Sequence, residues 1–119
     1  MPRSRRLEIP GLPHHVVQRG VDKQRAFFDR ASYVAYLYWL REYSKSHSVQ
    51  VHAWCLMRNH VHLLVTPSQS GSLSRMMQNL NRAYVQQVNY RRNHVGHLWA
   101  GRFKAAVVAD RAYFFCRMR

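Results

Sequence analysis

Residues 49–65 constrain the fold most, because they contain two stretches of strand-like sequence with a short turn between them. Residues 49–57 contain Val49, Val51 and Trp54, which favour strands, and show part of the alternation expected of a strand. Arg58 and Asn59 follow, and residues 60–65 are apolar except for two histidines. A two-residue connection of this kind favours a β-hairpin.

His60 and His62 stand two residues apart in the second of these strands. Because side chains alternate along a strand, both imidazoles should point to the same face of the sheet. Neighbouring neutral imidazoles can hold a divalent metal ion. The pair alone is a weak signal, since 8 histidines in 119 residues produce about half of one such spacing by chance. Packed or surface histidines are the alternative.

The remaining pattern predicts an α+β fold. Its expected elements are a strand over 14–19, a helix from an N-cap at Asp29 to about Ser46, a loop over 66–71, a helix capped by Ser72, a strand over 101–108 and a last helix capped by Asp110. The order β-α-β-β-α-β matches the ferredoxin-like motif, an antiparallel sheet with both helices on one face. The histidine strand would then be an inner strand, with its histidines on the open face.

The charge balance indicates the class of partner. Lys and Arg number 19 against 5 Asp and Glu, which gives a net charge of +14 and a pI of about 11.1. This excess favours a polyanion, and the planar guanidinium group fits phosphate. The helix from Ser72 has an apolar side and a basic, amide-rich side, and we expect the latter to face DNA.

Length and composition fit one domain over residues 1–119, with a basic leader over 1–9 and the start of a C-terminal helix over 111–119. No apolar run reaches the length of a membrane span, and residues 1–6 lack the apolar stretch of a signal peptide. Cys55 and Cys116 have no zinc-ligand spacing, so neither a structural zinc site nor a disulfide framework is expected. The reducing cytoplasm is the expected compartment.

Three separated blocks carry a resemblance to a known family: residues 58–65, the helix containing Met76-Met77-Gln78 with Tyr84 and Asn89, and residues 98–104. In this order they resemble the REP-associated tyrosine transposases and IS200-like transposases, which belong to the HUH (His-hydrophobic-His) single-strand nucleases. The resemblance extends from about Pro10 to the C-terminus.

The resemblance implies a metal-dependent enzyme acting on DNA. Its ferredoxin-like domain would bind single-stranded DNA, often with an adjacent hairpin, and His60 and His62 would hold Mg²⁺ or Mn²⁺. A tyrosine on the C-terminal helix would attack the scissile phosphate and leave a 5′-phosphotyrosine link and a 3′-OH. Trp99 or Tyr90 could stack on unpaired bases, although packing is the expected role of each. The backbone phosphates would be held by Arg75, Arg82, Arg91, Arg92, Arg102 and Lys104.

The chain departs from the family pattern near its C-terminus. Alignment of residues 110–119 with the stretch before the family's nucleophile places that tyrosine immediately after Arg119, so impaired cleavage is expected. Tyr113 is the internal substitute, with packing as its alternative role. We expect the tail after Asp110 to be poorly anchored or to recruit a neighbouring chain, giving a homodimer.

Two other functions stay open. A non-catalytic module that binds hairpin or single-stranded nucleic acid would need the same basic surface without the nucleophile. An RNA-recognition-type domain shares the element order, and residues 101–105 faintly resemble its aromatic strand. The second and third aromatic residues of that strand are missing here, so this alternative ranks last.

Overall fold

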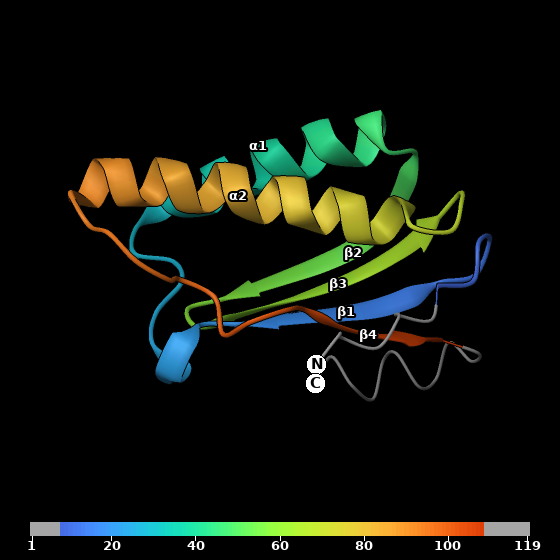
Figure 1. Ribbon diagram of the computed structural model, residues 1–119, viewed down its shortest axis with the longest axis horizontal. Coiled ribbons are helices and arrows are strands. Elements are labelled where there is room, and N and C mark those ends of the chain that lie inside the picture. Colours follow the sequence, from blue (N-terminus) through green and yellow to red (C-terminus); the bar gives the residue numbers. More distant parts are fainter. Residues whose placement is uncertain (1–7, 109–119) are drawn as a thin grey trace, which may run out of the picture.

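The computed structural model describes residues 8–108 and confirms the expected element order (Figure 1). Four strands and two long helices alternate as β-α-β-β-α-β, with one short 3₁₀ helix after the first strand. The elements are β1 (His14–Arg19), η1 (Val21–Lys23), α1 (Arg30–Ser46), β2 (Val49–Met57), β3 (His60–Pro67), α2 (Ser72–Arg92) and β4 (Lys104–Val107). Within this part of the chain, neither long helix has the length and apolar character needed to cross a lipid bilayer.

The four strands form one antiparallel sheet in the order β2-β3-β1-β4. Both long helices lie on the same face of this sheet (Figure 1), which is the ferredoxin-like arrangement. The prediction that the histidine strand is internal is confirmed, because β3 pairs with β2 on one side and β1 on the other.

The core lies between the sheet and the helices. β3 contributes Val61, Leu63 and Val65, all without solvent exposure. The predicted apolar stripe of α2 is buried against them, and full burial of one large apolar side chain stabilises the fold by about 1.5–3 kcal/mol. An aromatic cluster closes one end of the core; its members are Phe27, Tyr36, Tyr84 and Trp99.

Two strand boundaries differ from the prediction. β3 continues through Thr66 to Pro67, where β2 still pairs with it, although these two residues were expected in the loop. β4 begins only at Lys104 rather than at Gly101. Gly101 has a positive φ of 70°, and its carbonyl accepts a hydrogen bond from the Gln18 side chain. The chain therefore turns at Gly101 before it joins the sheet.

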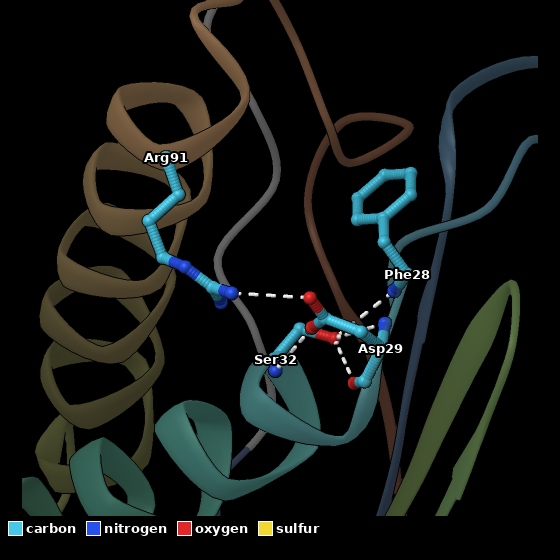
Figure 2. Close-up of polar contacts among 4 residues, drawn as sticks. All are labelled: Phe28, Asp29, Ser32 and Arg91. Atoms are coloured by element: carbon cyan, nitrogen blue, oxygen red, sulfur yellow. Dashed lines mark hydrogen bonds and ion pairs between the residues drawn. The ribbon is translucent and has the colours of Figure 1, made fainter.

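The predicted N-cap of α1 is confirmed. The Asp29 carboxylate accepts from the Ser32 backbone N–H at 2.9 Å, and the Ser32 hydroxyl accepts from the backbone N–H groups of Phe28 and Asp29 (Figure 2). This reciprocal arrangement is a capping box. It fixes the entry of the chain into α1.

The predicted cap of α2 is wrong. Gly71, in the left-handed conformation, is the N-cap, and Ser72 is the buried first residue of the helix. The carboxylate of Glu8 accepts from the backbone N–H groups of Gly71, Leu73 and Ser74 and from the Ser74 hydroxyl. A distant carboxylate thus replaces the local cap that sequence reasoning assumed. The helix expected after Asp110 lies outside the described residues.

Candidate metal and DNA site

The face of the sheet opposite the helices carries the histidine pair. Along β3, buried and half-buried residues alternate, and the three valine and leucine side chains of the core face the helices. His60 and His62 therefore project from the other face, as predicted. Their ring centroids lie 4.9 Å apart, with the ring planes at 78°.

A third histidine from the neighbouring strand joins this pair. His15 of β1 pairs with Leu64, next to His62 on the same face. Its Nε2 lies 2.9 Å from Nδ1 of His62, and the two rings are stacked with centroids 5.1 Å apart. His15 is almost fully buried, so it fixes the plane of the His62 ring.

The same ring nitrogen, Nδ1, has a hydrogen-bond partner in both His60 and His62. Nδ1 of His60 lies 2.7 Å from the Asn59 side-chain oxygen, which only accepts, so Nδ1 carries the proton. Nδ1 of His62 is bonded to His15. In both rings Nδ1 is therefore engaged and Nε2 is left to bind another group. This is the arrangement found around metal-ligating histidines.

Burial and neighbouring positive charge keep the pair neutral. The pKa of His62 is lowered to about 4, mainly by burial and also by charge repulsion from His15, His60 and Arg19. Burial is also the main cause of the lowered pKa of His60, and Arg19 adds to it. Neutral imidazole is the form that binds metal, so neither histidine has to lose a proton before it binds a metal ion at neutral pH.

Two cations flank the histidines on the same face. The register pairs Arg19 with His60 and pairs Val17 with both His62 and Lys104. Directly opposed residues share a face, so Lys104 lies two strands from His62, about 10 Å away. Arg19 and His15 are site residues that sequence reasoning missed. The sequence shows that His15 and Arg19 share one face of a strand, but it does not show that this strand pairs with β3.

The other predicted DNA contacts lie away from this face. Arg75, Arg82, Arg91 and Arg92 are exposed on α2, which covers the opposite face of the sheet. Arg91 forms an ion pair of 3.0 Å with Asp29 (Figure 2), and Arg92 lies 3.7 Å from the centre of the Phe28 ring. The structure therefore groups Lys104, but not the α2 arginines, with the histidine pair.

Arg102 lies beside an open hollow between α2 and the chain before β4. The hollow measures about 480 Å³, and its lining includes Gln18 and Asn81, which are hydrogen-bonded to each other at 2.9 Å. Of the two aromatic residues that could stack on bases, Tyr90 is 88% exposed. Trp99 is only 8% exposed and packs into the aromatic cluster, which confirms the packing role expected for it.

The donor set fits a divalent metal ion only in part. The two Nε2 atoms are suitable ligands for Mg²⁺ or Mn²⁺-type chemistry, and the neutral rings are ready to bind. No group of three or more His, Cys, Asp or Glu side chains within residues 8–108 has metal-site geometry. Tyr113, the candidate nucleophile, lies outside the described residues.

Comparisons with known proteins agree with this fold. Residues 9–114 match the family described as "Transposase IS200 like". The structure is similar to that of a REP-associated tyrosine transposase bound to a REP hairpin, with a TM-score of 0.78 and 14% identity over 98% of this chain and 68% of that chain.

A second similar structure is that of a protein from Deinococcus radiodurans R1 assigned as a transposase. Its TM-score is 0.68, with 15% identity over 99% of this chain and 94% of that chain. A search of curated protein sequences finds no match. The family match covers most of the sequence and agrees with both fold similarities. The chain therefore belongs to the IS200-like transposase family, a family of enzymes that move DNA.

Proposed function

We propose that this chain binds single-stranded DNA with an adjacent hairpin and takes part in metal-dependent cleavage and joining of that strand. The observation that carries the proposal is the sheet face opposite the two long helices, where two neutral histidines, each with Nδ1 engaged, are flanked by Arg19 and Lys104. Family membership supports the reaction class. The hairpin bound by the similar REP-associated transposase supports the substrate.

His60 and His62 would hold the metal ion, Mg²⁺ or Mn²⁺, through their Nε2 atoms. When bound, such an ion polarises a phosphoryl oxygen and offsets charge that develops at the scissile phosphate. His15 would accept the Nδ1 proton of His62 in a hydrogen bond and hold its ring in place. The protein would thus supply a preset pair of ligands rather than assembling them on binding.

Arg19 and Lys104 would contact the DNA backbone on either side of the histidines. Their positive charges face outward on the same surface, where phosphates of a bound strand would run. Arg75, Arg82, Arg91, Arg92 and Arg102 would add contacts to DNA that extends beyond this face. Such contacts make affinity salt-dependent without specifying sequence.

Strand cleavage would proceed through a tyrosine that attacks the phosphorus, displaces the 3′ oxygen and forms a 5′-phosphotyrosine ester. The ester conserves the bond energy for rejoining, so no nucleotide cofactor is needed. Tyr113 is the candidate within this sequence. The second candidate function is a binding module that recognises the hairpin without cleaving it.

The cellular compartment and the oligomeric state of the protein stay predictions. The proposed DNA substrate and the free thiol of Cys55 both fit the reducing cytoplasm. A homodimer, the other expected partner, also stays a prediction.

The test uses this 119-residue chain and a 3′-labelled single-stranded DNA with a hairpin, resolved on a denaturing gel. A labelled protein–DNA adduct that needs Mn²⁺ and disappears in Tyr113→Phe and His62→Ala would support cleavage by these residues. Specific hairpin binding without an adduct would favour the binding module. Binding no tighter than to an unrelated single strand would contradict both functions.

A further inference from the structure

A second basic surface lies where the first turn of α1 meets the β2–β3 turn. An open hollow of about 370 Å³ is present there. Three exposed arginines, Arg25, Arg30 and Arg58, line it together with aromatic side chains and Asp29. We propose that this hollow binds an unpaired nucleotide of the DNA strand, with the arginines on its phosphates. The inference rests on the DNA-binding role proposed above and names a site within it.

The hollow keeps a net positive charge. Among residues 8–108, Asp29 and Arg91 form the only ion pair, so the acid of the hollow already has a basic partner. The Ser32 backbone hydrogen bond is the main cause of the lowered pKa of Asp29. The guanidinium groups of the three lining arginines have no hydrogen bond or ion pair with any described residue. They are therefore available to a phosphate group from outside the protein.

The aromatic lining favours an unpaired nucleotide over a duplex. Tyr33, half-buried at the rim, stacks on Phe27 with ring centroids 4.6 Å apart and planes at 6°. Phe28 is covered on one face by the Arg92 guanidinium. Only unpaired bases present a ring face to such side chains, and combinations of aromatic rings and arginines are typical of single-strand binding surfaces. A duplex would present only its phosphates to this hollow.

The backbone joins this hollow to the histidine site. The carbonyl of Arg58 accepts from the backbone N–H groups of Ala26 and Phe27 at 2.7 and 3.1 Å, so the lining segment is fixed to the β2–β3 turn. Asn59 follows and contacts His60. Arg58 and His60 are two residues apart, at most about 7 Å along an extended chain. A DNA strand that crosses the histidine face would therefore reach the hollow with its next few nucleotides.

The experiment compares two double variants that each remove two positive charges. Arg25→Ala/Arg30→Ala changes the hollow, whereas Arg41→Ala/Lys45→Ala changes exposed residues near the other end of α1. Binding is measured by fluorescence anisotropy over a range of KCl concentrations. One probe is a DNA hairpin with a single-stranded extension, and the other is the same hairpin without it. Circular dichroism checks that every variant is folded.

We expect the hollow variant to bind the extended hairpin about tenfold more weakly, with a salt slope reduced by about 1.4, since each single-strand phosphate contact contributes about 0.7. The control variant should change the affinity by no more than about twofold. On the hairpin without the extension, the two double variants should bind with the same affinity. Tyr33→Leu should weaken binding of the extended hairpin about fivefold without changing the slope.

Equal losses of affinity in the two double variants would overturn the proposed site, because the loss would then follow from net charge rather than from the position of the arginines. An equal loss on the blunt hairpin would overturn the unpaired occupant and indicate duplex contacts. If the unmodified chain binds neither hairpin, the proposed DNA-binding function itself fails. That result is distinguishable from failure of the hollow alone.

Discussion

At the scale of single residues, the histidine face depends on hydrogen bonds that the sequence does not reveal. The period of two in β3 sufficed to predict that His60 and His62 share a face, because alternation is a local property of a strand. His15 could not be assigned to the site in the same way. Its contact with His62 depends on the register between β1 and β3, which are more than forty residues apart in sequence.

Substitution of His15 should weaken metal binding. Loss of the hydrogen bond to Nδ1 leaves the His62 ring free to rotate, so His15→Ala should raise the Kd for Mn²⁺ about 10- to 100-fold, as measured by titration calorimetry. His52→Ala is the control, because His52 is a strand histidine bonded to Thr66 instead. An unchanged Kd in His15→Ala, or an equal change in His52→Ala, would contradict the orienting role.

At the scale of elements, two of the few acidic residues stabilise the N-terminal ends of the long helices. Of the five acids in the chain, Asp29 and Glu8 lie at the N-terminal ends of α1 and α2, where negative charge complements the helix dipole. Asp29 could be predicted because an N-cap is local to its helix. Glu8 could not, since it contacts residues more than sixty positions away.

Removal of the Glu8 carboxylate should destabilise α2. Glu8→Ala leaves the N–H groups of Leu73 and Ser74 without their acceptor, so the free energy of unfolding should fall by about 1–2 kcal/mol. Glu8→Gln, which keeps one acceptor oxygen, should lose less. Urea denaturation measures both. Glu42→Ala, an exposed change on α1, should stay within about 0.5 kcal/mol of the unmodified chain; a similar loss there would argue against a specific cap.

The charge of Asp29 should make stability depend on pH. Its pKa is lowered from the ordinary 3.8 in the folded chain, so its stabilising contribution is present above about pH 4 and is lost as the pH falls through the lowered value. Asn is also a good N-cap, so Asp29→Asn isolates the charge. The Tm of the unmodified chain should exceed that of Asp29→Asn at pH 6, and the gap should close near pH 2. A constant gap would refute this account.

At the scale of the whole molecule, the fold leaves one face of the sheet without a long helix from the described residues and gives that face its chemistry. The β-α-β-β-α-β order could be predicted because each element has its own periodicity. The α2 arginines were expected to contact DNA, and α2 covers the face of the sheet opposite the histidines. Sequence therefore indicated the class of partner, but the distribution of the arginines required the three-dimensional structure.

The most direct test of this account is a Mn²⁺ titration of the chain followed by NMR of its imidazole groups. Paramagnetic broadening depends on distance from the ion and reports the site without requiring activity. We expect the His60 and His62 signals to disappear first, followed by that of His15, while those of His14 and His52 persist. Equal broadening of all the imidazoles, or first loss at His52, would contradict a metal site on the histidine face.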